Sequence, residues 1–305
     1  MRFLIAMGAA CVMVLPASAQ FPQAKPARSL VQFATSLSQR MFLPGEAIEL
    51  ELKLLNNSGG PLTFSPEDGW LDVIITALVK PTGEGALVDR LKPVVVRETF
   101  TMQHTDAART LVDLAPAFDL RRPGLYRITA MMSYRGGTAP VTAEPLTINV
   151  VPGYKLAELE FGLPRTDPDA PLEVRKYSLQ QLTLTEPREM RLYVTVSDEA
   201  EEIIFRQIKL GRMAGSDKPP TRLDRLSNLH VLHQAEGGRH FVHSVVSPRG
   251  DVLVRETYET VGARPGLELN ADGMVTVKGG IRRPRPDDIL PAKLKPIEGE
   301  VRVKP

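Results

Sequence analysis

The chain has one cysteine, Cys11, and it lies within the first nineteen residues. Those residues have the layout of a cleaved secretory signal peptide: Arg2, an apolar run over 3–15, and an Ala-Ser-Ala cleavage site at 17–19. Removal of this segment removes the cysteine, which excludes disulfides, thiolate nucleophiles and thiolate metal ligands in the mature protein. We therefore expect a secreted or periplasmic protein that is stabilised by apolar burial without covalent cross-links.

Several other features are scarce. No later stretch approaches the roughly 18 apolar residues of a membrane helix, so we expect no transmembrane span after cleavage. The 38 basic and 36 acidic residues nearly balance, and no basic stripe carries interleaved aromatic residues, so no nucleic-acid partner is expected. Aromatic residues make up 6% of the chain, with Trp70 as the single tryptophan. An aromatic sugar-binding strip is therefore weakly supported, and we expect Trp70 in the core.

The sequence is rich instead in short apolar runs separated by turn residues. Residues 47–56 alternate apolar and charged side chains with a period of two, which is typical of a half-buried strand. Similar runs cover 70–79, 94–102, 125–134 and 146–151. The 26 prolines fall mostly between such runs, and helical periodicity is almost absent. These features predict an all-β protein, with a flexible N-terminus at 20–27 and an antiparallel β-sandwich over 28–152.

Two segments of this first unit carry a family resemblance: "LPGEAIELELKLLNNSG" at 43–59 and "FDLRRPGLYRITA" at 118–130. The pattern resembles bacterial secreted immunoglobulin-like and fibronectin-III-like domains, including the macroglobulin-type sandwiches. The resemblance implies an immunoglobulin-like sandwich in which Tyr126 is a corner residue that packs a turn onto the sheet. It concerns the fold only, because sandwiches of this kind host many unrelated functions.

The second half is predicted to contain a proline-rich linker at 153–171, a second antiparallel β domain at 172–281 and a basic, proline-rich tail at 282–305. Residues 229–258 faintly resemble blades of bacterial sialidase-type propellers, but about two blades are present and a ring needs at least about four. A second small sandwich or an irregular antiparallel sheet is therefore favoured. The tail is expected to be extended and largely disordered, either as a solvated segment or as a tether to anionic envelope polymer.

The strongest candidate site is the segment "HVLHQAEGGRHFVH", which contains His230, His233, His240 and His243. If the turn is centred on Glu236-Gly237, residue i pairs with 473 − i. The four histidines then form two cross-strand pairs, 230 with 243 and 233 with 240, with Cβ atoms about 4.5–5.5 Å apart. Residues three apart on a strand point to opposite faces, so no four-ligand cage forms. A turn at Gly237-Gly238 would make both pairs diagonal.

Three interpretations of these histidines stay open. In the first, the histidines fill half-buried strand positions and each ring makes local hydrogen bonds. In the second, each pair is functional: it binds Zn²⁺ or Cu²⁺ together with a carboxylate or water, or it senses pH. The third is catalysis, for which the chain offers no H-E-x-x-H, G-x-S-x-G, P-loop or Cys-His motif.

The features above favour a non-catalytic binding or scaffolding protein at the cell envelope. Its ligand would be a protein or polysaccharide, held through loops and sheet edges. One alternative is a metal-binding protein or enzyme that uses the hairpin 230–243. Another is an inhibitor-like sandwich that presents loop 80–92 or 212–227 to a protease.

Overall fold

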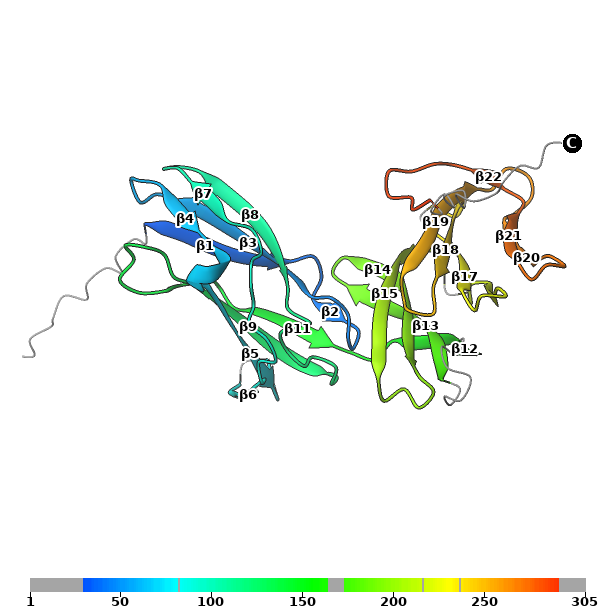
Figure 1. Ribbon diagram of the computed structural model, residues 1–305, viewed down its shortest axis with the longest axis horizontal. Helices are drawn as coiled ribbons and strands as arrows, with labels where there is room; N and C mark the ends of the chain where they lie inside the picture. The colour runs from blue at the N-terminus through cyan, green and yellow to red at the C-terminus, as the bar shows by residue number, and fades with distance from the viewer. Residues whose placement is uncertain (1–29, 82, 164–172, 216, 236, 291–305) are drawn as a thin grey trace, which may run out of the picture.

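The computed structural model describes residues 30–81, 83–163, 173–215, 217–235 and 237–290. The predicted signal peptide and the N-terminus at 20–27 lie outside this range. The described chain is all β, with a single 3-10 turn, η1 (Pro66–Asp68). It forms two units, each built around its own apolar core, that follow one another along the chain (Figure 1). Within the part of the chain described, no helix has the length and apolarity to cross a membrane.

The first unit contains two larger sheets and one small one. The first sheet has the order β1-β3-β8, from β1 (Val31–Leu37), β3 (Glu49–Asn56) and β8 (Ala107–Asp113). The second has the order β2-β11-β9-β5-β6, with β10 beside β9. Its strands are β2 (Met41–Phe42), β5 (Leu71–Leu78), β6 (Gly85–Leu87), β9 (Gly124–Met132), β10 (Val141–Thr142) and β11 (Leu146–Val150). A third sheet pairs β4 (Leu62–Phe64) with β7 (Phe100–Met102). All pairings are antiparallel except that of β2 with β11.

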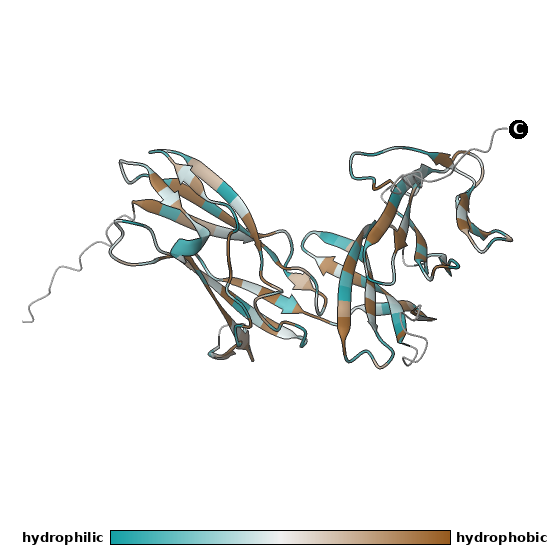
Figure 2. Cartoon of the chain, in the orientation of Figure 1, coloured by the Kyte–Doolittle hydropathy of each residue, from teal (hydrophilic) through white to brown (hydrophobic). Residues whose placement is uncertain are grey.

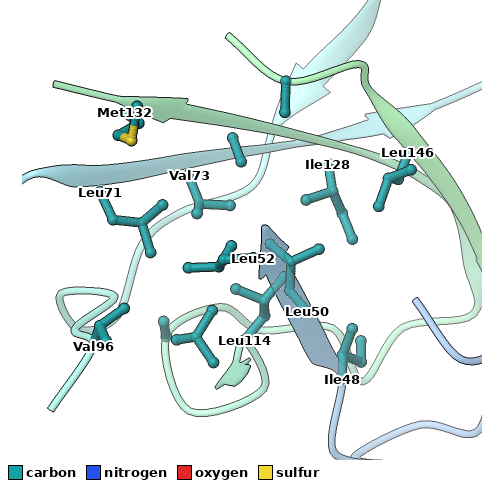
Figure 3. Packing of buried hydrophobic residues seen from close by; sticks show 14 of the residues in the cluster. Ile48, Leu50, Leu52, Leu71, Val73, Val96, Leu114, Ile128, Met132 and Leu146 are labelled. Carbon is teal, nitrogen blue, oxygen red and sulfur yellow. The ribbon is translucent and has the colours of Figure 1, made fainter. Parts of the chain in front are cut away.

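The core of the first unit lies between its two larger sheets, as the alternation over 47–56 predicted. Leu50 and Leu52 of β3 are fully buried and lie opposite Val73 of β5 and Ile128 of β9 (Figure 3). Trp70 is buried and packs edge-on against Phe64 and Phe100, which confirms its expected place in the core. The Tyr126 hydroxyl donates to the carbonyl of Arg122 at 2.7 Å and so holds a turn against the sheet.

One predicted strand of this unit is wrong for most of its length. Of residues 94–102, only Phe100–Met102 form a strand. Val96 is buried in the core and Val94 packs against it, so the apolar run satisfies a packing requirement without strand pairing. The structure also has a strand, β8, where the sequence analysis had predicted none.

The second unit begins earlier than the sequence predicted. Residues 154–162, assigned to a linker, form β12 (Tyr154–Gly162), because Ala157, Leu159 and Phe161 alternate toward the second core. Its first sheet has the order β12-β13-β14-β15, with β13 (Val174–Thr185), β14 (Arg188–Asp198) and β15 (Ile204–Met213). The apolar face of this sheet packs against a second sheet, which supplies Leu229, Val231 and Val246 to the same core.

That second sheet has the order β16-β17-β18-β19-β22. Its strands are β16 (Thr221–Leu223), β17 (Leu229–Gln234), β18 (His240–Val246), β19 (Val252–Glu259) and β22 (Ile281–Arg282). A separate hairpin joins β20 (Gly266–Leu269) to β21 (Val275–Lys278). Hydropathy along the strands of both units alternates between apolar and polar residues in many places (Figure 2).

The predicted tail is ordered over its first residues. Residues 282–290 lie against β19: Arg283 N donates to the Thr257 carbonyl at 2.8 Å, and Ile289 exchanges hydrogen bonds with Arg255. The Asp288 carboxylate accepts from the Arg282 guanidinium at 2.7 Å and from the Arg285 main-chain N–H at 2.8 Å. The expectation of a disordered tail therefore does not hold for 282–290, and residues 291–305 lie outside the described range.

Candidate functional site

The histidine hairpin is formed by β17 and β18, and its register differs from the first one predicted. His230 pairs with Val245 and His233 with Val242, so the numbers of paired residues add up to 475 and not to 473. Gly237 and Gly238 have φ of 74° and 73°, left-handed values that favour glycine. The Gly237-Gly238 alternative is therefore confirmed, and the 473 register is wrong because the two glycines dictate the turn.

His230 and His243 nevertheless come together as a diagonal pair. Both side chains are buried, and their rings stack with centroids 5.2 Å apart and an interplanar angle of 27°. The Nδ1 of His230 lies 3.0 Å from the Nε2 of His243, which is a hydrogen-bond distance. One of these two facing nitrogens must carry the bridging proton.

Each outer nitrogen of this pair faces a carboxylate. The Nε2 of His230 lies 3.4 Å from Oδ2 of Asp224, and the Nδ1 of His243 lies 3.9 Å from Oε2 of Glu256. Burial raises the pKa of Asp224, but hydrogen bonds from Asn228 and Leu226 together lower it by more than burial raises it. The pKa of Asp224 therefore lies below its ordinary value. Asp224 is therefore ionised at neutral pH.

This ionisation fixes the protons along the pair. An ionised Asp224 accepts from the Nε2–H of His230, which leaves Nδ1 of that ring as an acceptor. His243 must then donate through Nε2, and its Nδ1 keeps a lone pair. That Nδ1 atom is buried and has no hydrogen-bond partner among the described residues. Burial first, and repulsion from His230 second, lower the pKa of His243 to about 4.

His233 and His240 do not form a comparable pair. His233 is 1% exposed and contacts β15 at Arg212, and burial lowers its pKa to about 4. His240 is half-buried near the hairpin turn, opposite Glu259 of β19. Among the residues that the structure covers, no three histidine, cysteine, aspartate or glutamate side chains are grouped so as to hold one metal ion.

The histidine network is therefore closed within the protein. Three of the four ring nitrogens hydrogen-bond to each other or to Asp224, the exception being Nδ1 of His243, and no described hydroxyl group hydrogen-bonds to either ring of the pair. Ser244, the nearest serine in sequence, follows His243 on a strand and so points to the opposite face. Burial lowers the pKa of both His230 and His243, so the sheet keeps the two rings neutral.

A second candidate site lies at the outer edge of β8. Two hydrogen bonds show which main-chain groups of β8 face β3: Leu114 N donates to Ile48 O, and Asn56 N donates to Asp106 O. Because hydrogen-bonded pairs alternate along an antiparallel pair of strands, the even-numbered residues of β8 bond to β3. The main-chain N–H and C=O of Arg109 and Leu111 therefore point away from the sheet. In the described chain, β8 pairs with no strand on that side.

The opposite wall of this edge is the irregular segment 92–99. It is anchored at its start by the hydrogen bond from Leu91 N to Ala117 O at 2.8 Å and at its end by β7. Between these anchors the main chain of 92–99 makes no hydrogen bond to any described residue. Most of the segment is exposed, and the buried Val96 holds it against the core.

Between the two walls lies a groove of about 670 Å³. Its rim exposes apolar side chains, since Leu111 is 60% and Val95 44% exposed. The groove is lined by Glu49, residues 92–98, residues 110–113, Pro116 and Ala117. An edge of unpaired main chain beside an open groove can accept an extended peptide as an added strand.

This site was not predicted from the sequence because its two walls have misleading patterns. The continuous run Val94-Val95-Val96 indicates a buried strand, yet it forms an unpaired wall. In β8, apolar and polar residues alternate poorly, with Leu111 on the solvent side. Pro93, which lacks a main-chain donor, was the available signal that the run does not enter a sheet.

Comparisons with known proteins give little further information. No protein-family model matches the chain, and no curated protein matches it. Among solved structures, a match is the sporulation control protein Spo0M from Bacillus subtilis, at 12% identity and a TM-score of 0.29. That match covers 59% of this chain and 89% of the other. A similarity at this level carries no argument about fold family or function.

Proposed function

We propose that this protein is a non-catalytic binding module of the cell envelope that captures an extended segment of a partner protein at the β8 edge. The observation that carries the proposal is a groove with unpaired main chain on both walls. An added strand would lie about 4.8 Å from β8, bonded to Arg109 and Leu111 on one side and facing 92–99 on the other.

The groove also defines the partner's chemistry. Its main-chain donors and acceptors fit a polypeptide backbone, and Leu111 and Val95 fit an apolar side chain on the exposed face of the strand. Charges differ between the ends: Arg109 lies near the start of β8, whereas Asp113 and Glu49 lie together at its end, where they are paired in register. A complementary strand would carry an acidic residue near Arg109 and a basic residue near Asp113.

The test uses a substitution that removes one outward donor and leaves the β3 ladder intact. Leu111→Pro deletes the N–H that points into the groove, whereas Leu111→Thr keeps it and serves as the matched control. Peptides would be selected from a displayed random library on the wild-type protein, and their affinities measured by calorimetry on all three proteins.

We expect Leu111→Pro to weaken binding about tenfold or more, because a lost hydrogen bond and a steric clash together exceed about 1.4 kcal/mol. Leu111→Thr should bind with a smaller loss. Equal affinities for wild type and Leu111→Pro, with circular dichroism unchanged, would refute binding at this edge. A library that gives no binder would also count against the proposal.

A further inference from the structure

The tail segment 297–305 has the sequence "IEGEVRVKP", in which charged and apolar residues alternate with a period of two over most of its length. On an extended strand, its charged residues would share one face and its valines the other. The charged residues are, in order, Glu298, Glu300, Arg302 and Lys304. The segment lies beyond residue 290, outside the described part of the chain. Its sequence is typical of a strand whose charge changes from negative to positive along its length.

The outer face of β8 has the opposite order of charges. The exposed Arg109 lies near its start, and Asp113 lies at its end, paired in register with the exposed Glu49. Arg109 and Asp113 are four positions apart, and the same spacing separates Glu300 from Lys304. A strand added parallel to β8 would therefore place Glu300 beside Arg109. It would also place Lys304 beside Asp113, whereas an antiparallel strand would bring like charges together.

The same parallel register fits the main chain of the β8 edge. The outward N–H of Leu111 would donate to the carbonyl of Val301, and the carbonyl of Leu111 would accept from the N–H of Val303. Both valine side chains would then point to the inner face of the sheet. On that side of the groove Val112 and Val96 are buried, so the added valines would extend an existing apolar surface.

The groove that this segment can reach belongs to a second copy of the chain. The described chain ends beside β19 of the second unit, where Ile289 is hydrogen-bonded, whereas β8 belongs to the first unit. Figure 1 shows these two elements on opposite sides of the junction between the units, where the Tyr193 hydroxyl donates to Glu46 at 2.9 Å. The nine residues 291–299 span at most about 32 Å, roughly the diameter of a single unit. A second copy imposes no such limit.

We infer that residues 299–304 of one copy add to β8 of another copy as a parallel strand and so join copies head to tail. The inference rests on the proposed function, because it uses the same groove and names the partner as a second copy of this chain. Each copy offers one groove and one tail segment. The contact is therefore heterologous, and copies should form open chains that lengthen with concentration.

The test follows the mass of the intact mature chain by sedimentation velocity from about 1 to about 100 µM. Leu111→Pro removes a main-chain donor of the groove, and Val301→Pro removes a donor of the tail segment. Leu111→Thr and Val301→Thr keep these donors and are the matched controls. We expect wild type to associate, the threonine variants to lose little, and each proline variant to associate about tenfold or more weakly.

A mixture of the two proline variants tests whether the contact is heterologous. Leu111→Pro keeps an intact tail segment, and Val301→Pro keeps an intact groove. Equal amounts should therefore form dimers of one copy each and no longer chains. If the tail segment occupied the groove of its own chain, wild type would stay monomeric at every concentration and the mixture would form no dimer. That result would overturn the inference.

A charge exchange tests the direction of the added strand. Arg109→Glu should weaken association about two- to fivefold, as is usual for an exposed ion pair. Glu300→Arg introduced into the same chain should restore it, because the two charges attract again in the parallel register. A double variant that associates more weakly than Arg109→Glu alone would contradict that register.

Failure of this inference can be told apart from failure of the proposed function. A wild-type chain that stays monomeric, while a library-selected peptide binds it and binds Leu111→Pro more weakly, would overturn only the inference. Association that persists unchanged in both proline variants would place the contact elsewhere and would also overturn it. If neither selected peptides nor a second copy bind at β8, both proposals fail.

Discussion

At the scale of single residues, burial decides what the histidines can do. When a histidine is kept neutral inside a sheet, the free energy of unfolding falls as the solution becomes acidic. The reason is that the histidine binds a proton in the unfolded chain but not in the folded chain. His243 and His233 are in this position, each with its pKa lowered to about 4. The residue types could be read from the sequence, but their burial depended on a register that only the turn glycines determined.

We predict that the free energy of unfolding falls as the pH drops from about 6.5 toward about 4. Above that window both states are neutral at these rings and the contribution is constant. Each of the two histidines should cost about 3 kcal/mol across the window, since one pKa unit corresponds to about 1.4 kcal/mol. The slope of the free energy of unfolding against pH, measured by urea unfolding, gives the number of protons taken up on unfolding. His243→Gln should lower that number by about one relative to wild type. A profile as steep as that of wild type would contradict the assignment.

At the scale of elements, the alternation of apolar and polar residues predicted the central strands well. It failed where a segment packs apolar residues in the core without pairing with a neighbouring strand. The runs at 47–56 and 125–134 became β3 and β9 because each has one face in the core. Residues 94–98 are apolar for the same packing reason, but no neighbouring strand pairs with them. Residues 154–162 were assigned to a linker because prolines surround them, whereas Leu159 and Phe161 place them in a sheet.

The histidine hairpin supports a prediction about metals at this scale. Two nitrogens that bind one tetrahedral Zn²⁺ at about 2.0–2.1 Å lie about 3.3 Å apart, farther than the 3.0 Å between the facing nitrogens of His230 and His243. We therefore expect Zn²⁺ and Cu²⁺ to bind only weakly, as measured by calorimetry on the purified protein. Tight binding that is lost in a His230→Ala, His243→Ala double variant would establish a metal site and contradict this expectation.

At the scale of the whole molecule, an all-β fold with two cores was predictable, and the junction between the units was not. The strand-and-turn pattern indicated both cores, and a chain with one cysteine can form no disulfide within itself to stabilise them. The contact through Glu46 and Tyr193 joins residues 147 positions apart, and neither residue type has a local pattern that reveals the pairing. The β8 groove likewise depends on which strand ends up at a sheet edge.

Hydrogen–deuterium exchange at the amides of Arg109 and Leu111 tests the central claim most directly. These two amides point out of the sheet, so they should exchange rapidly in the free protein. A saturating selected peptide should slow both by about tenfold or more, while amides of the even-numbered residues of β8 keep their rates. Unchanged exchange at Arg109 and Leu111, with protection at another edge, would contradict capture of an extended partner at β8.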